Sequence, residues 1–308
     1  SMGSDIADIN NDGFSDLFVL DMSPEDYIRS KTTMSMMSID RFQNMIDNNY
    51  YYQYMHNVLQ LNNGNGTFSE IANLSGVSKT DWSWASLIAD FDLDGYNDIY
   101  VTNGVYRDVV DRDANIEINK YIDAHKPSLT DKDFYNFTKK LPQQKLVNYF
   151  FKNNGKLEFT NTTKEWANET PTFSNGAVYV DLDNDGDLDI VTNNLDENAT
   201  ILKNNSRELS KGNYLQITLK GPKTNPFGAG AIVTVYKTKD DILTRQLINA
   251  RGYLSSQSNK LHFGLGNLNK IDSLSVTWSN NAKQTIYNVG VNQLLNLDYA
   301  ESNLIKKN

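Results

Sequence analysis

The sequence contains no cysteine and only three histidines among its 308 residues. Without cysteine the chain can form neither a disulfide framework nor a thiol-based active site, although this absence leaves the cellular compartment open. His56, His125 and His262 lie far apart and show no metal-ligand spacing. His262 falls in a strand-like run, where a packed or hydrogen-bonded side chain is the simpler interpretation. The sequence therefore predicts no catalytic residue and no organic cofactor.

Long apolar runs and basic clusters are also missing. No apolar run approaches the roughly 18 residues that a membrane-spanning helix needs, so no membrane span is predicted. The chain carries 38 acidic against 29 basic residues, a net charge of −9. A nucleic-acid partner would require a clustered basic face, and none is evident in the sequence.

The acidic residues are concentrated in three copies of the motif D-x-[DN]-x-D-G-x-x-D. We call them loop one (residues 8–16), loop two (residues 90–98) and loop three (residues 181–189). The glycine at the sixth position permits the positive φ that reverses the chain. Short carboxylates at alternate positions of such a loop converge on one point. Calcium prefers six to eight oxygen ligands, so the motif predicts calcium sites.

The predicted ligands are the residues at positions one, three, five, seven and nine, where position seven contributes its backbone oxygen. They are Asp8, Asn10, Asp12, Phe14 and Asp16; Asp90, Asp92, Asp94, Tyr96 and Asp98; and Asp181, Asp183, Asp185, Asp187 and Asp189. The alternative is an Asx-rich turn without metal. Three copies, each with acids that would repel one another without a cation, favour about three calcium ions. Loop one, which has an asparagine in place of one aspartate, should bind most weakly.

Strand-like segments flank the loops, which therefore join β-strands, unlike the helix-flanked EF-hand loop. The loops begin 82 and 91 residues apart, and a fixed period of this kind indicates a repeat architecture. An Asn-Asn-Gly turn at residues 62–64 recurs at 153–155, with a shorter echo at 201–205. Each unit is predicted to contain four strands, as in a propeller blade. The first unit is expected to retain only Ile6 and Ala7 of its opening strand.

The loops and the N-N-G hairpins resemble FG-GAP/VCBS repeats, the calcium-bearing blades of integrin-like β-propellers. This resemblance implies a propeller of about seven blades, of which three would form an open arc. The chain is therefore expected to be a piece of a longer protein that begins inside a repeat.

Two inserts, residues 23–56 and 106–148, interrupt the repeats at the same inter-strand position and have helical spacing. Asp131 is predicted to cap a helix that begins near Lys132. Both inserts should project from the face opposite the calcium loops and form a ligand surface there. The alternative is that the aromatic side chains in and beside the inserts simply pack the inserts onto the blades. The candidate ligand-binding residues are Tyr52, Tyr54, Trp82, Trp84, Arg107 and Asp108.

From about residue 211 the pattern changes to short strand-like runs separated by turn signals, which predicts a β-sandwich. The segments 225–231, 251–257, 261–266 and 275–278 resemble the ASPIC/UnbV domain. That domain commonly follows VCBS repeats, and the resemblance extends to cartilage-acidic-protein-like secreted proteins.

The fold prediction is a mainly β chain, with a partial β-propeller over residues 1–210 and a β-sandwich over residues 211–308. The predicted function is that of a calcium-binding, secreted, periplasmic or cell-surface module for adhesion or binding of a protein or glycan. One alternative is an enzyme or accessory subunit of glycan processing, for which the acidic residues between Asp108 and Glu117 are the nearest candidates. Another is a structural spacer within a longer surface protein.

Overall fold

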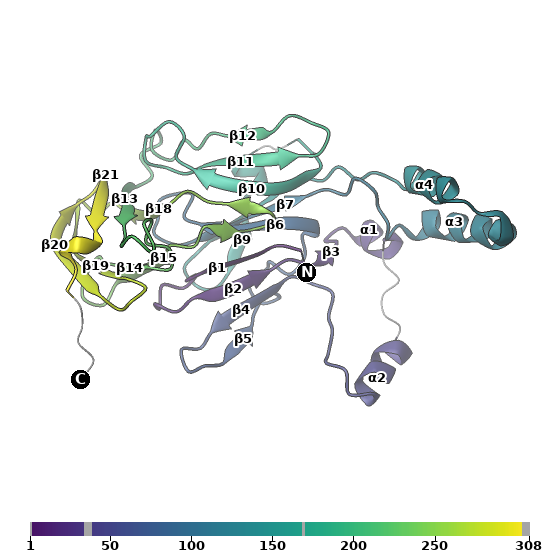
Figure 1. Cartoon of the computed structure of the whole chain (residues 1–308), viewed down its shortest axis with the longest axis horizontal. Coiled ribbons are helices and arrows are strands. Elements are labelled where there is room, and N and C mark those ends of the chain that lie inside the picture. The colour runs from purple at the N-terminus through teal and green to yellow at the C-terminus, as the bar shows by residue number, and fades with distance from the viewer. Residues whose placement is uncertain (1, 34–38, 168–169, 304–308) are drawn as a thin grey trace.

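The computed structural model describes residues 2–33, 39–167 and 170–303. Three small sheets stack side by side, and a second β-rich domain lies at one end of the stack (Figure 1). The helical inserts project from the other end (Figure 1). The predicted fold class, mainly β with a partial propeller followed by a β-rich domain, is confirmed.

Each of the three stacked sheets contains two neighbouring strands joined by one of the acidic loops, and we count the strands of each sheet from the first of that pair. Sheet one has the order β1 (Ser4–Ala7), β2 (Asp16–Val19), β4 (Val58–Asn62) and β5 (Phe68–Glu70). Sheet two has the order β3 (Met22–Ser23), β6 (Asp81–Ala89), β7 (Asp98–Asn103), β8 (Tyr149–Asn153) and β9 (Phe159–Asn161). Sheet three consists of β10 (Ser174–Val180), β11 (Asp189–Asn194) and β12 (Thr200–Leu202).

Apolar side chains fill the spaces between neighbouring sheets. One buried cluster, which includes Phe18, Leu59 and Ile99, joins residues of sheets one and two. A second, which includes Tyr100 and Ile190, joins residues of sheets two and three. Successive residues of a strand point to opposite faces of its sheet, so an apolar stretch such as β7 supplies side chains to both clusters.

Two expectations for the strands were wrong. β1 spans four residues rather than two, and Ser4 already pairs with Val19. Within the described residues sheet three has no fourth strand. Its Asn-Asn pair is followed by Ser206, whereas Gly64 and Gly155 adopt positive φ (67° and 74°) at the corresponding turns. Glycine adopts such a conformation at little cost, and without it the chain turns away towards the next domain.

The inserts contain α1 (Tyr27–Thr32) and α2 (Ile39–Asp47), then α3 (Arg112–His125), the 3-10 turn η1 (Lys126–Ser128) and α4 (Asp131–Lys140). A further short helix, α5 (Thr163–Trp166), follows β9. The predicted cap at Asp131 is one residue late. Thr130 has extended backbone and forms a capping box with Asp133, so the helix starts at Asp131.

The C-terminal domain contains two sheets that enclose one apolar core. The first has the order β18 (Lys260–Gly266), β13 (Asn213–Lys220) and β21 (Gln293–Asp298). The second has the order β15 (Ile242–Gln246), β14 (Ile232–Tyr236), β19 (Lys270–Thr277) and β20 (Lys283–Gly290). A short hairpin, β16 (Ala250–Arg251) and β17 (Ser255–Ser256), forms its own small sheet, and the 3-10 turn η2 (Tyr299–Glu301) follows β21. In the described part of the chain no helix is long and apolar enough to cross a membrane.

Candidate functional site

The three acidic loops share one backbone conformation. The glycine at position six has positive φ in each loop: 90° at Gly13, 96° at Gly95 and 104° at Gly186. The residue at position four also has positive φ, with values of 58° at Asn11, 65° at Leu93 and 60° at Asn184. This second left-handed residue was not anticipated. Asparagine tolerates the conformation, but a leucine there is strained, which shows that contacts elsewhere hold loop two in place.

The aspartate at position nine ties each loop to the third strand of its sheet. Asp98 accepts hydrogen bonds from the backbone N–H groups of Phe91 (3.0 Å) and Asn153 (2.9 Å). The equivalent pairs of donors are Ile9 and Asn62 for Asp16, and Leu182 and Asn204 for Asp189. These bonds fix the orientation of the carboxylate, and each oxygen retains a second lone pair for a cation.

Loops two and three bring carboxylates together in a way that suits a hard cation. Ligand oxygens of Asp90, Asp92 and Asp94 lie within 4.8 Å of one another, as do those of Asp181, Asp183 and Asp189. Five buried carboxylate oxygens have no hydrogen-bond partner. They are Asp90 Oδ1, Asp92 Oδ1, Asp181 Oδ1, Asp185 Oδ2 and Asp187 Oδ1. Burying a charged oxygen without a partner is costly, so these residues fit a bound divalent cation that accepts their lone pairs.

Loop one is less suited to a cation. Within the described residues its acids do not form a cluster of three with ligand atoms close together. At position three, Asn10 Nδ2 donates a hydrogen bond to Asp12 Oδ2 at 2.9 Å. The side-chain NH2 group of Asn10 therefore faces a carboxylate of its own loop. The residues that the motif predicts as ligands are present, but loop one does not converge as closely as the other two.

The electrostatics of the loops reflect crowded, buried acids. Burial, reinforced by the nearby charge of Asp94, raises the pKa of Asp90 to about 7. Burial likewise raises the pKa of Asp187 to about 7 and that of Asp16 to about 6. A raised carboxyl pKa means that the ionised form lacks compensating positive charge, which a divalent cation would supply.

Two lysines that sequence reasoning missed lie against these carboxylates. Lys152 Nζ contacts Asp92 and lies 2.8 Å from Asp94 Oδ2. Lys203 Nζ lies 2.8 Å from both Asp183 Oδ2 and Glu208 Oε1. Both lysines precede the Asn-Asn pair of a third strand, so a repeated Lys-Asn-Asn triplet could have revealed them. Their ammonium groups partly neutralise the acids that are predicted to hold metal.

The C-terminal domain covers loops two and three. Gly266 N donates to Leu93 O at 2.8 Å, and Gln216 Nε2 donates to Asp181 Oδ2 at 2.5 Å. His262 Nε2 lies 2.9 Å from Gly186 O. Burial lowers the pKa of His262 to about 4, so the ring is neutral at physiological pH, in agreement with the expected hydrogen-bonded role. The metal loops therefore also form an interface between the two domains.

A hairpin of the C-terminal domain lies along the first strands of the stacked sheets. Arg251 donates to Asp5 Oδ1 at 2.6 Å, and both side chains are buried. Gly252 exchanges backbone hydrogen bonds with Ser4. Trp84 packs its ring on Tyr253 (centroids 5.0 Å apart) and donates Nε1–H to Gly104 O. Trp84 is thus engaged in packing between the domains.

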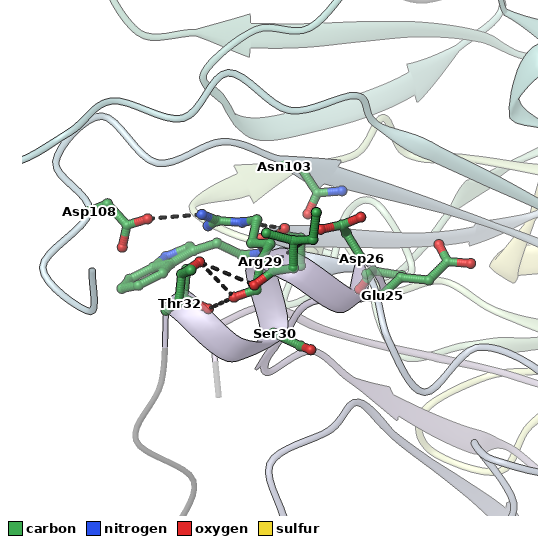
Figure 2. Close-up of polar contacts among 12 residues, drawn as sticks. Glu25, Asp26, Arg29, Ser30, Thr32, Asn103 and Asp108 are labelled. Carbon is green, nitrogen blue, oxygen red and sulfur yellow. Dashed lines mark hydrogen bonds and ion pairs between the residues drawn. The ribbon is translucent and has the colours of Figure 1, made fainter. Parts of the chain in front are cut away.

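The bases of the two inserts are joined by a buried ionic cluster (Figure 2). Arg29 of α1 donates to Asp81 Oδ2 at 2.5 Å and to Asp108 Oδ2 at 3.0 Å. Asp108 is 0% exposed, so its carboxylate anchors the first insert to the second and does not face solvent. Trp82 lines a small cavity beside Arg29 and is half-buried.

The tyrosines of the first insert are the most exposed of the candidate ligand residues. Tyr52 and Tyr54 both contact the ring of Phe42 (centroids 6.2 and 5.8 Å), while Tyr51 is 91% exposed. Arg107 stacks over the neighbouring Tyr106 ring at 4.6 Å. Among the described residues no ring contact joins Trp82 or Trp84 to these tyrosines. The structure thus leaves Tyr52 and Tyr54 exposed, half-buries Trp82, Trp84 and Arg107, and buries Asp108.

Two of the four acids considered for an enzymatic alternative have structural partners. Asp108 pairs with Arg29, and Asp111 caps α3 by accepting from Ala114 N at 2.8 Å. Neither is placed as a free carboxylate in a pocket, which general acid–base catalysis would require.

Comparison with known proteins supports the resemblance inferred from the motifs. Residues 46–101 match the family described as FG-GAP-like repeat, and residues 221–304 match the family described as ASPIC and UnbV. The chain is 27% identical over 245 residues to cartilage acidic protein 1 of Xenopus tropicalis and 26% identical over 258 residues to that of Mus musculus. Each alignment covers 72% of this chain but only 38% of the relative.

Proposed function

We propose that this chain is a calcium-binding module of an extracytoplasmic protein, which presents its exposed insert side chains to a protein or glycan partner. The observation that carries the calcium assignment is the set of buried carboxylate oxygens without partners in loops two and three. The similarity to FG-GAP-like repeats and to cartilage acidic protein 1 supports an extracellular setting.

The geometry favours calcium over magnesium and over transition metals. The predicted ligands are carboxylate, amide and backbone oxygens of one loop, a set that suits the high and variable coordination number of calcium. Magnesium requires near-ideal octahedral geometry, and zinc prefers histidine or cysteine ligands. When bound, calcium would neutralise the convergent acids, and the position-nine aspartates would keep each loop fixed to its third strand.

Bound calcium would also stabilise the domain arrangement. Loop two holds Leu93 in a left-handed conformation, where its carbonyl accepts from Gly266 of the C-terminal domain. Asp181 of loop three accepts from Gln216 of the same domain. Because these contacts involve the loops themselves, ordering the loops with metal supports the surface on which the C-terminal domain rests.

Partner binding is assigned to the insert face because its helices bury little of their own surface. Within the described residues α1, α2 and α3 contain no buried residue, whereas Ile39, Tyr51 and Tyr135 are exposed. Exposed apolar side chains can mark an interaction site, and tyrosine is enriched among residues that dominate binding energy. The Arg29 cluster holds both inserts at one end of the blades.

Calcium binding is tested by calorimetric titration of the chelator-treated protein together with thermal melting. A site filled at a hundredfold excess over Kd contributes about 2.7 kcal/mol to the stability of the native state. We expect calcium uptake and a melting temperature several degrees higher than in chelator, and Asp185→Ala should lose part of the increase. Asp272→Ala, an exposed aspartate of β19, is the matched control and should retain it. No heat of binding and identical melting curves would refute the assignment.

Partner binding is tested with arrays of glycans and extracellular protein fragments. Tyr51→Ala removes an exposed ring and should leave the melting temperature unchanged while weakening binding about 30-fold, the effect of a 2 kcal/mol hot spot. Tyr287→Ala, an exposed tyrosine on β20, is the control and should bind normally. Equal loss with both variants, or no loss with either, would place the binding surface elsewhere.

A further inference from the structure

The outer edge of sheet three differs from the outer edges of the other two sheets. In sheet one the third strand β4 pairs with β5, and in sheet two β8 pairs with β9. Among the described residues nothing pairs with the outer edge of β12. Its backbone N–H and C=O groups on that side are therefore available to an extended peptide.

The registers of the three sheets identify which residues correspond. The second and third strands pair Leu17 with Gln60 in sheet one, Ile99 with Phe151 in sheet two, and Ile190 with Leu202 in sheet three. The fourth strands of sheets one and two begin with a phenylalanine opposite the first asparagine of the Asn-Asn pair. The corresponding position in sheet three is Asn204, which has no strand opposite it within the described residues.

In sheet two the phenylalanine of the fourth strand fills the space towards the preceding sheet. Phe159 of sheet two is 8% exposed and belongs to the buried cluster with Leu59 and Ile71 of the sheet-one unit. Phe68 of sheet one, which has no preceding sheet in this chain, is 52% exposed. The missing phenylalanine of sheet three would thus be expected between sheets two and three.

A cavity of about 550 Å³ lies at that place. Its lining includes Ile190 and Leu202 of sheet three, together with Phe150 and Trp166. Phe150 and Trp166 lie 91 residues after Leu59 and Ser75, the same separation as between Phe68 and Phe159. Ser75 is the residue whose carbonyl accepts from Phe159 N in the preceding interface. The cavity therefore corresponds to the position that Phe159 occupies one sheet earlier.

We propose that the free edge of β12 and this cavity form an acceptor site for an extended peptide strand that places an aromatic side chain between sheets two and three. The peptide would add to the sheet as β9 adds to β8, with its aromatic residue opposite Asn204. Main-chain hydrogen bonds provide affinity in strand addition, and a pocket for one side chain provides specificity.

The chain itself indicates the chemistry of the occupant. The equivalent strands read Phe68-Ser-Glu and Phe159-Thr-Asn, an aromatic residue followed by a small hydroxyl residue and a polar one. The cavity lining includes the apolar side chains of Phe150, Trp166 and Ile190, which would surround an inserted aromatic ring. Lys152 and Lys203 of the lining are already paired with acids, so the aromatic side chain and the main chain of the edge strand, rather than charge, define the occupant.

The test uses a fluorescent peptide with the sequence of residues 155–161 (GKLEFTN) and the whole chain, measured by fluorescence anisotropy. Saturable binding is expected, and the peptide carrying Phe159→Ala should bind at least tenfold more weakly because the cavity would stay empty. Equal affinity of the two peptides, or no binding at millimolar concentration, would overturn the proposal.

The position of the peptide is tested by disulfide cross-linking, since the chain has no cysteine of its own. Leu209→Cys places a thiol on an exposed residue that lines the cavity, and Leu74→Cys places one on an equally exposed residue beyond sheet one. A peptide with a terminal cysteine should cross-link to the first variant and not to the second. Equal cross-linking to both variants would show that the peptide does not bind at this edge. If light scattering shows a stable dimer that excess peptide does not dissociate, a second copy of the chain and not a peptide occupies the edge.

Discussion

Replacing Arg251 with methionine removes the guanidinium that pairs with Asp5, and it keeps much of the apolar stem. Asp5 is almost fully buried, and after the change its carboxylate would retain only the N–H donors of Ile6 and Ile88. Burial already raises the pKa of Asp5 above its usual value even with the guanidinium present, so the unpaired charge is costly. Breaking a buried pair in this way typically costs about 3–5 kcal/mol.

The assay is urea denaturation followed by tryptophan fluorescence. Trp84 packs on Tyr253, two residues beyond Arg251, so its emission reports whether the hairpin stays on the sheets. We expect Arg251→Met to lower the free energy of unfolding by about 3–5 kcal/mol. The double variant with Asp5→Asn should recover at least about 1 kcal/mol, because an amide is far less costly to bury than a carboxylate.

Two results would contradict this reasoning. An Arg251→Met midpoint equal to that of the wild-type chain would show that the ion pair contributes nothing to the position of the hairpin. A double variant no more stable than Arg251→Met alone would show that the loss arises from packing of the arginine stem and from its bonds to the carbonyls of Ile6 and Ile248.

Three further predictions follow from the loops and the inserts. Calcium affinity should fall about tenfold or more from about pH 8 to about pH 6, measured by calorimetry, because the protons held by Asp90 and Asp187 (pKa about 7) must be displaced by the metal. Gly264→Ala should lower both the melting temperature and calcium uptake, because the added Cβ would lie 2.0 Å from Asp90 Oδ2 and close to the backbone of loop two. In the control Gly290→Ala the added Cβ meets only a flexible side chain, so the melting temperature should not change. Arg29→Met should speed cleavage of the inserts by chymotrypsin without changing cleavage of the C-terminal domain, since it releases the clamp between the inserts; equal cleavage rates would show that the clamp is dispensable.

The sequence by itself determined the acidic loops, their hairpin setting and most of the strands. Each loop is nine consecutive residues, so the spacing of Asp90, Asp92 and Asp94 already places their carboxylates at alternate positions of one turn, where they converge in the structure. Strand alternation is equally local, which is why short strands separated by turns could be predicted after residue 211, where the structure has β13 to β21. The loops and the N-N-G hairpins carried the resemblance to FG-GAP-like repeats because both motifs are short and recur along the chain.

Only the tertiary structure decided which of these elements meet. Arg251 and Asp5 are separated by 246 residues, and Arg29 and Asp108 by 79, and no local pattern specifies such pairings. Asp108 has the residue type of a ligand group but is buried as an anchor, because its exposure depends on where α1 packs. The missing outer strand of sheet three, by contrast, goes with a local difference in sequence, since Ser206 stands where the other two turns have glycine at positive φ.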